Sequence, residues 1–200
     1  MVVDSNLSTY FAGAAGEAET VTAPDRAPGS LELVRLFENT LSLPDGPDEL
    51  DTVEHAAAWC RRHGLPAVAG NAELHRLRDF REALRDVLFA NNGEGRSRDA
   101  WEGLRSFVAP ARLVLAIELE GRLALRPSDP DCDGAIASLL ARVHDALLEG
   151  TWPRLRACRK ATCRFAYYDR TKNASRAWCS MATCGNQAKA QRRRHRERPH

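Results

Sequence analysis

The chain has 200 residues and a net charge of +2, a length that suits one large domain or one domain with a small added module. The charge is spread unevenly, because residues 151–200 carry 14 Lys and Arg against 2 Asp and Glu, while residues 1–150 carry 15 against 25. A basic end of net +12 beside an acidic body of net −10 favours a module that binds a polyanion such as nucleic acid. No apolar run approaches the length of a membrane span and no secretory signal is visible. We therefore expect a soluble, cytoplasmic protein with no membrane partner.

The periodicity of apolar residues divides the chain into three parts. Residues 1–29 are polar, broken by prolines and without a period, which predicts a flexible N-terminal arm. Residues 30–150 form a body in which apolar residues recur at the three- and four-residue steps of buried helix faces. Residues 151–200 form a C-terminal module. The body helices are expected over residues 30–39, 48 or 51 to 63, 71–91, 99–108 and 134–149.

The longest predicted helix, residues 71–91, has leucines on one side and arginines on the other. The leucine face should pack in the core, because burial of one apolar face is what holds a helix on a domain. The arginines that we expect to point largely outward are Arg76, Arg78, Arg81 and Arg85.

One segment of the body changes from helical to alternating periodicity. Leucine or isoleucine occupies every second position from Leu113 to Leu119, Glu120 and Gly121 turn the chain, and Leu123 and Leu125 continue the alternation. This pattern predicts a β-hairpin. A two-stranded hairpin is marginal alone, so we expect its apolar face to pack on the helices. The predicted fold class is α+β, with a predominantly helical body, one β-hairpin and a small C-terminal module.

We find no enzymatic constellation in the body and expect no enzyme activity. No nucleophile, base and orienting group occur in a recognisable arrangement. The run from Asp129 to Gly134 copies the start of a calcium-binding loop, but Leu140 stands where a bidentate Glu is required. A turn followed by a helix N-cap is therefore the better interpretation.

The C-terminal module contains two cysteine pairs of equal spacing. Cys158 and Cys163 are followed, after fifteen residues, by Cys179 and Cys184. Four thiolates can close a tetrahedral shell around one zinc ion. Five residues turn an ideal helix by about 140° past a full revolution, so each pair must include a turn or a helix end. We expect one structural zinc, since four cysteines leave no open position for a catalytic water.

Two other uses of these cysteines are open at this stage. An iron–sulfur cluster is the chief rival, because such clusters also take four cysteines. Two disulfides would need an oxidising compartment, for which the sequence gives no signal. Phe165 and Trp178 are expected to form the small core of the module, and the roles of Tyr167 and Tyr168 are left open.

A basic segment follows the last cysteine. Asn186 can cap a helix over residues 187–198. Gln187 or Lys189, in its first turn, could reach a base edge or a phosphate. The arginines further along, Arg192, Arg193, Arg194, Arg196 and Arg198, suit phosphate contacts.

The residues of the module resemble the bacterial CGNR-type zinc finger family over roughly residues 152–194. The body is similar in outline to the ABATE-type domain usually joined to that finger, a stress-responsive, ligand-sensing α+β transcription regulator. That likeness rests on the run Phe37–Leu41, on the helix that contains Trp59 and ends at Gly64, and on the hairpin. The finger residues that carry the resemblance are Trp152, Arg154, Arg156, Cys158, Cys163, Phe165, Asp169, Asn173, Ser175, Arg176, Trp178, Cys179, Ser180, Met181, Cys184, Gly185, Asn186 and Lys189.

The resemblance implies four cysteine zinc ligands and a DNA-binding transcription regulator that acts on the nucleoid. One position departs from the family pattern, because Gln187 replaces the arginine that closes the signature. If that arginine contacts DNA, the protein should bind more weakly or prefer adenine to guanine. The expected nucleic-acid contacts are Arg176, Asn186, Gln187, Lys189, Arg192, Arg193, Arg194 and Arg196.

The sequence thus predicts a regulator of duplex DNA with one zinc, whose body binds a small-molecule effector, forms a homodimer, or both. The alternative from another class is an RNA- or protein-interaction adaptor in which zinc only holds the fold together.

Overall fold

The computed structural model describes residues 26–196 except 42, 44–45, 94–96 and 120. The predicted arm, residues 1–29, therefore lies mostly outside the described residues. The helices are α1 (Leu31–Glu38), α2 (Val53–Arg62), α3 (Asn71–Ala90), α4 (Ser97–Val108), α5 (Cys132–Leu148) and α6 (Asn186–Arg196). The strands are β1 (Leu113–Ile117), β2 (Leu123–Pro127), β3 (Leu155–Ala157) and β4 (Ala166–Tyr168). Two short helical turns are η1 (Trp152–Arg154) and η2 (Met181–Gly185).

The predicted fold class is confirmed, since helices dominate and β1 and β2 form the expected antiparallel hairpin. A second antiparallel hairpin, β3–β4, was not predicted from the sequence. Its strands have three residues each, too few to produce a recognisable alternation. Among the described residues, no helix is long and apolar enough to cross a membrane.

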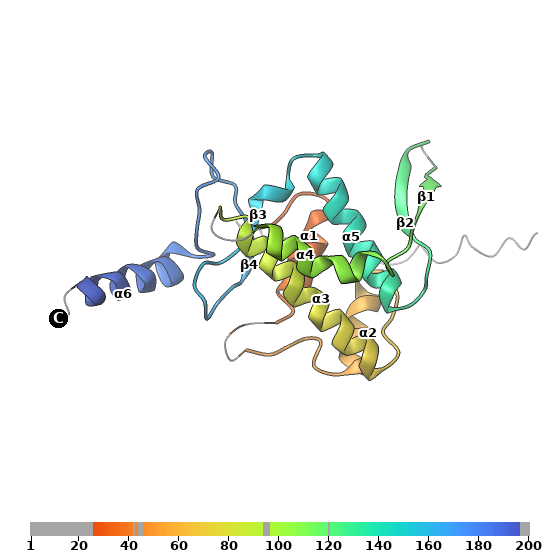
Figure 1. Ribbon diagram of the computed structural model, residues 1–200, viewed down its shortest axis with the longest axis horizontal. Coiled ribbons are helices and arrows are strands. Elements are labelled where there is room, and N and C mark those ends of the chain that lie inside the picture. The colour runs from red at the N-terminus through yellow and green to blue at the C-terminus, as the bar shows by residue number, and fades with distance from the viewer. Residues whose placement is uncertain (1–25, 42, 44–45, 94–96, 120, 197–200) are drawn as a thin grey trace, which may run out of the picture.

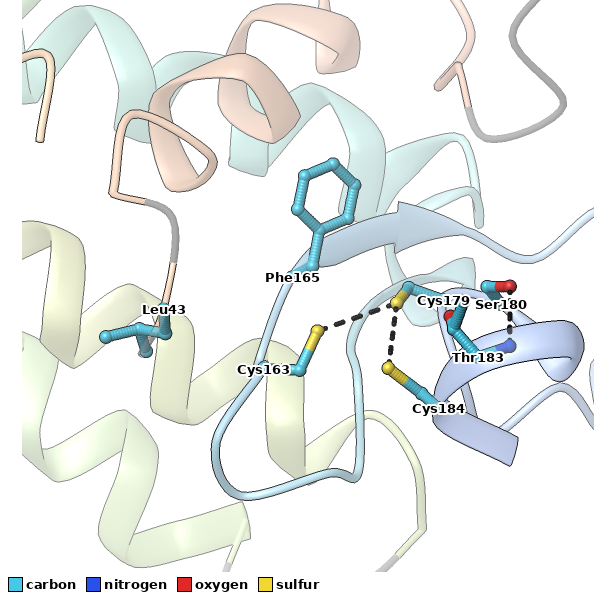
Figure 2. Close-up of a pocket in the computed structure, with 7 residues that line it drawn as sticks. All are labelled: Leu43, Cys163, Phe165, Cys179, Ser180, Thr183 and Cys184. Atoms are coloured by element: carbon cyan, nitrogen blue, oxygen red, sulfur yellow. Dashed lines mark hydrogen bonds between the residues drawn. The ribbon is translucent and has the colours of Figure 1, made fainter. Parts of the chain in front are cut away.

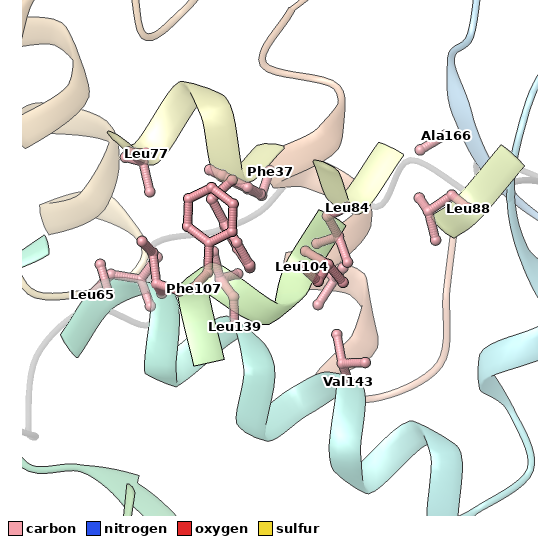
Figure 3. Packing of buried hydrophobic residues seen from close by; sticks show 14 of the residues in the cluster. Phe37, Leu65, Leu77, Leu84, Leu88, Leu104, Phe107, Leu139, Val143 and Ala166 are labelled. Atoms are coloured by element: carbon pink, nitrogen blue, oxygen red, sulfur yellow. The ribbon is translucent and has the colours of Figure 1, made fainter. Parts of the chain in front are cut away.

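The core lies between α3 and the helices around it. Helix α3 packs against α1, α4 and α5 in the body and against β3 of the module. Figure 3 shows how Phe37 from α1, Leu84 from α3, Leu104 from α4 and Val143 from α5 meet in the interior. The same core extends to β3 and β4, because Leu155 and the small side chain of Ala166 belong to it. The module is therefore packed on the body (Figure 1).

The chain enters α5 through a tight loop, as the sequence predicted. Asp131 is the N-cap, and its side chain accepts a hydrogen bond of 3.1 Å from the backbone N–H of Gly134. A Cβ at Gly134 would lie 1.8 Å from the carbonyl oxygen of Asp129. Glycine is needed there because any side chain would collide with the backbone of the loop. The prediction of a turn and an N-cap is confirmed.

The outward orientation predicted for the arginines of α3 was wrong for two of them. Arg81 and Arg85 are only 2% and 0% exposed. Arg81 donates two hydrogen bonds, of 2.6 and 2.8 Å, to the carboxylate of Asp48. Burial alone would raise the pKa of Asp48, but the hydrogen bonds from Arg81 and from the Leu50 N–H, together with the charges of Arg81 and Arg78, outweigh it and hold that pKa below its ordinary value. Helical periodicity places these arginines beside the core but does not reveal partners that are distant in the chain.

Most of the apolar face of the β1–β2 hairpin is exposed, although Leu113 packs against the core, so the expectation that this face packs on the helices needs a second correction. Leu115, Ile117 and Leu123 are 66%, 77% and 60% exposed. Strand β2 packs against α5, and β1 lies on the outside (Figure 1). The alternation predicted the strands correctly, but it does not indicate what covers their apolar side.

Candidate metal centre

The first cysteine pair is positioned by the β3–β4 hairpin. Cys158 directly follows β3, and its backbone N–H donates a 2.9 Å hydrogen bond to the carbonyl of Phe165. The chain then reverses in a turn closed by a 2.8 Å bond from the Cys163 N–H to the carbonyl of Lys160. This turn brings the side chains of Cys158 and Cys163 to the same side of the hairpin.

The second pair is positioned by a cap and a π-helical turn. Cys179 precedes Ser180, whose hydroxyl accepts a 3.3 Å hydrogen bond from the N–H of Thr183 at the start of η2. Cys184 lies in the last turn of η2, immediately before α6. Each pair therefore includes a turn or a helix end, as the five-residue step required. Figure 2 shows three of the sulfur atoms and the Ser180 cap around one small volume.

The four sulfur atoms form a cluster of the size that zinc requires. The Sγ atoms of Cys158, Cys163, Cys179 and Cys184 all lie within 4.8 Å of one another. Cys179 Sγ is 3.6 Å from Cys163 Sγ and 3.7 Å from Cys184 Sγ. Four thiolates at about 2.3 Å from zinc in a regular tetrahedron lie about 3.8 Å apart, so the donor set fits the ion. These separations are far longer than the about 2.05 Å of a disulfide bond, which excludes that alternative for these pairs.

Bringing four thiols together also changes their acidity. Hydrogen bonds from the thiols of Cys163 and Cys179 lower the pKa of Cys158 to about 3. The pKa of Cys179 is raised. The largest cause is the hydrogen bond of its thiol to the Cys158 sulfur, and the next is its hydrogen bond to the Cys163 sulfur. A bound dication would stabilise the thiolate form of all four ligands and complete the site.

Two aromatic residues, Tyr167 and Trp178, form the core of the module around the cysteines. Trp178 packs with Tyr167 and with Cys158 and Cys184, as predicted for a miniature core. Tyr167 is fully buried, and its hydroxyl donates a 2.7 Å hydrogen bond to the carbonyl of Arg176. Tyr168 is buried in the core of the body. Neither tyrosine is placed to stack on a nucleic-acid base.

Phe165 has a different position from Trp178. It is half-buried and lines a cavity of about 330 Å³ together with Leu43 and the sulfur cluster (Figure 2). The cavity opens beside Cys163 and Cys179 and belongs to the metal centre.

A buried carboxylate organises the loop between the two cysteine pairs. Asp169 accepts hydrogen bonds of 2.9 Å from the N–H of Thr171 and 2.9 Å from the N–H of Arg176. Burial alone would raise the pKa of Asp169. The hydrogen bonds from Thr171, followed in importance by the one from the Arg176 N–H, hold this pKa below its ordinary value. The guanidinium of Arg176 lies over the ring of Tyr167 and donates to the carbonyls of Trp178 and Cys179. Arg176 is thus bound within the module, on the approach to the second cysteine pair.

Three asparagines of the body hold the edges of the β3–β4 hairpin. The amide of Asn39, at the end of α1, donates to the carbonyl of Ala166 at 2.9 Å and accepts from its N–H at 2.8 Å. Beyond α3, Asn91 donates to the carbonyl of Leu155 at 2.9 Å, and Asn92 donates to that of Ala157 at 2.8 Å. These amides take the place of neighbouring strands. In the sequence, Asn39 is recognisable only as part of the run Phe37–Leu41. The Asn91–Asn92 pair only marks the end of the predicted helix that starts at residue 71.

Beneath the same hairpin, α3 contributes a buried arginine and α1 a buried acid. Arg85 donates hydrogen bonds to the backbone carbonyls of Glu38, at 2.5 Å, and of Arg164, at 3.2 Å. The Glu38 carboxyl is fully buried, and its oxygens have no hydrogen-bond partner within the described residues. Burial raises its pKa to about 8, because it outweighs the attraction of Arg85. The carboxyl is therefore neutral at pH 7, and the Arg85 contacts to the backbone link α1 to the first cysteine turn.

The basic helix α6 starts at the metal centre and projects away from the body (Figure 1). The Gln187 side-chain oxygen accepts a 2.6 Å hydrogen bond from Lys160 of the first cysteine turn. Most of the predicted nucleic-acid contacts lie along this helix. Arg176 lies outside it. The exposed ones are Asn186, Gln187, Lys189, Arg192, Arg193 and Arg194. Arg196 is the last residue of α6, and its side chain lies outside the described part of the molecule.

Comparison with protein families agrees with this geometry. Residues 154–198 match the CGNR zinc finger family. Residues 30–150 match the ABATE family, whose description is "putative stress-induced transcription regulator". The chain belongs to the ABATE family. A comparison with curated proteins gives no match. The finger match and the four-cysteine cluster together confirm the predicted structural zinc, which Cys158, Cys163, Cys179 and Cys184 would hold.

Proposed function

We propose that the protein is a transcription regulator that binds duplex DNA through α6. The proposal rests on the position of this basic helix, which begins at the metal centre and projects away from the body (Figure 1). Helix α6 begins two residues after Cys184, and its main contacts are with η2. Zinc bound at Cys184 and the Lys160–Gln187 hydrogen bond would together fix its first turn.

The dimensions and the charge of α6 suit a DNA groove. Its 11 residues span about 16 Å, and the major groove of B-DNA admits one α-helix. Lys189, Arg192 and Arg193 lie at positions i, i+3 and i+4 and so share one face, which we assign to phosphate contacts. Gln187 lies on a different face, in the first turn. Its side-chain oxygen is bonded to Lys160, so its amide N–H groups are the ones available to a base edge.

We further propose that the body regulates this binding, through an effector, through dimerisation, or through both. The body contains a cavity of about 480 Å³ between β2 and α5, lined by Leu125, Arg126 and Arg142 among others. This volume is in the range of small-molecule sites. A screen of metabolites by thermal shift would test the effector role, and Ala124→Trp, which fills the cavity from β2, should abolish any shift. A shift that survives in this variant would contradict the assignment of the cavity.

The test of the DNA proposal is a selection of bound fragments from the source genome by zinc-loaded protein. We expect enrichment of one duplex site, with an affinity that falls steeply as salt is raised. Structured or single-stranded RNA should be added as competitor at equal concentration. If RNA displaces the duplex, or if binding survives removal of residues 186–200, the adaptor alternative replaces this proposal.

A further inference from the structure

The outer strand of the β1–β2 hairpin is an unprotected sheet edge. Within the described part of the chain, this sheet has two strands only. Exposed edge strands are usually protected by charges, prolines or bulges, because their free backbone groups pair with other chains. The five residues of β1, Leu113 to Ile117, contain none of these devices. Three apolar side chains of the strand are also exposed, namely Val114, Leu115 and Ile117.

The backbone of β1 is presented for one further strand. The N–H of Ser128 donates to the carbonyl of Arg112, and the N–H of Glu118 donates to that of Arg122, so even-numbered residues of β1 face β2. Antiparallel ladders alternate, so the N–H and C=O groups of Leu113, Leu115 and Ile117 point away from β2. The free edge therefore belongs to the same residues that form the apolar face.

Charge selects a second copy of this chain as the occupant. The two ends of β1 carry opposite charges, because Arg112 precedes the strand and Glu118 follows it. If two β1 strands pair antiparallel about a two-fold axis at Leu115, Leu113 lies opposite Ile117. In the same register, Arg112 of each copy lies opposite Glu118 of the other copy, whose carboxylate also accepts hydrogen bonds from Arg122 and Arg126 of its own hairpin. The pairing keeps the apolar side chains on one face and matches opposite charges at both ends.

We propose that the protein forms a homodimer by antiparallel pairing of β1 with β1 of a second copy, centred on Leu115, which joins the two hairpins into one four-stranded sheet. This specifies the dimerisation role left open in the proposed function. The contact itself uses no residue of the finger, so it can be tested without DNA. A two-fold dimer would present two α6 helices, which suits an operator with two related half-sites.

The first test is sedimentation of the full-length, zinc-loaded protein over a range of concentrations without DNA. We expect a reversible monomer–dimer equilibrium. Leu115→Lys places two like charges at the two-fold axis and should weaken dimerisation at least tenfold, and Ile117→Lys should act in the same direction. The matched control is Val108→Lys, another exposed apolar position, at the end of α4, which should leave the equilibrium unchanged. A monomer at all concentrations, or a dimer that all three variants retain, overturns the proposal.

The second test fixes the register with single cysteines. Across a two-fold axis at Leu115, its two Cα atoms would lie about 5.5 Å apart, within the range of a disulfide. The two Val114 positions would be diagonal neighbours, about 7–8 Å apart. With oxidised glutathione, Leu115→Cys should give a covalent dimer, whereas Val114→Cys and the wild type should not. Equal cross-linking of the two variants, or none in either, overturns the register. Measurement of DNA affinity on the same samples keeps this result separate from the DNA proposal.

Discussion

The two hairpins of this protein show that the same local structure can have opposite surroundings. Both β1–β2 and β3–β4 are antiparallel pairs. The first is longer and more apolar, yet Leu115, Ile117 and Leu123 face solvent. The second has only three residues in each strand, yet five of its six residues are buried, and body side chains hold its edges. Stability in so short a hairpin comes from its partners: the core, the asparagines and the metal centre.

The largest effect should come from removing a metal ligand. Cys179→Ser should release zinc and unfold the finger, because a structural zinc contributes about 10–16 kcal/mol in isolated fingers. Since β3 and β4 are part of the body core, thermal unfolding of the body should also shift to lower temperature. Zinc content and calorimetry measure both effects. Cys60→Ala, at a buried cysteine far from the cluster in the chain, should keep its zinc. A Cys179→Ser protein with full zinc content would contradict this ligand set.

Matched leucine substitutions compare the two hairpins directly. Leu155→Ala in β3 removes a fully buried side chain and should cost about 2–5 kcal/mol of the free energy of unfolding. Leu115→Ala in β1 should cost less than about 0.5 kcal/mol, when measured at a concentration where the protein is monomeric. Chemical denaturation gives both values. Similar losses of unfolding free energy at the two positions would mean that the two hairpins depend equally on packing against the body.

The pH dependence of stability should reveal the acid beneath β3–β4. Folding raises the pKa of Glu38 from 4.5 to about 8, so the folded state keeps a proton that the unfolded state has lost. Stability should therefore fall as pH rises from about 5 to about 8, with a loss of about 2 kcal/mol between pH 6 and 8. Glu38→Gln cannot ionise and should lack this loss. Parallel pH profiles for the two proteins would exclude a buried, neutral Glu38.

A smaller effect should come from the edge of β4. Asn39→Ala removes two hydrogen bonds to the backbone of Ala166 and leaves buried groups without partners, at a cost of about 2 kcal/mol. Zinc content should not change. Asn173→Ala, at an exposed asparagine of the finger loop, is the matched control and should have almost no effect. Equal stability of the two variants would show that the Asn39 contacts do not support the hairpin.

The sequence predicted those parts of the fold that depend on local periodicity. The five body helices, the β1–β2 hairpin and the Asp131 N-cap follow from spacing and capping, which act within a few residues. The metal centre was also predictable, because ligand type and spacing define it.

The contacts that the sequence did not reveal join segments far apart in the chain. Arg85 bonds to Glu38 and Arg164, and Asn92 bonds to Ala157. No local pattern indicates which arginine or asparagine will find a backbone partner after folding. The exposure of Leu115 was not predictable for a similar reason. Alternation shows which residues share a face of the hairpin, but it does not show whether another element packs on that face.

We propose that the zinc-anchored helix α6 binds DNA, and the salt dependence of DNA affinity measures its contribution. The logarithm of affinity for the selected duplex should fall linearly with the logarithm of salt concentration. Arg192→Gln/Arg193→Gln should reduce that slope by about 2, because each phosphate contact contributes about 1. Arg61→Gln/Arg62→Gln, an exposed pair on α2, should keep the wild-type slope. The same slope in all three proteins would contradict DNA binding through α6.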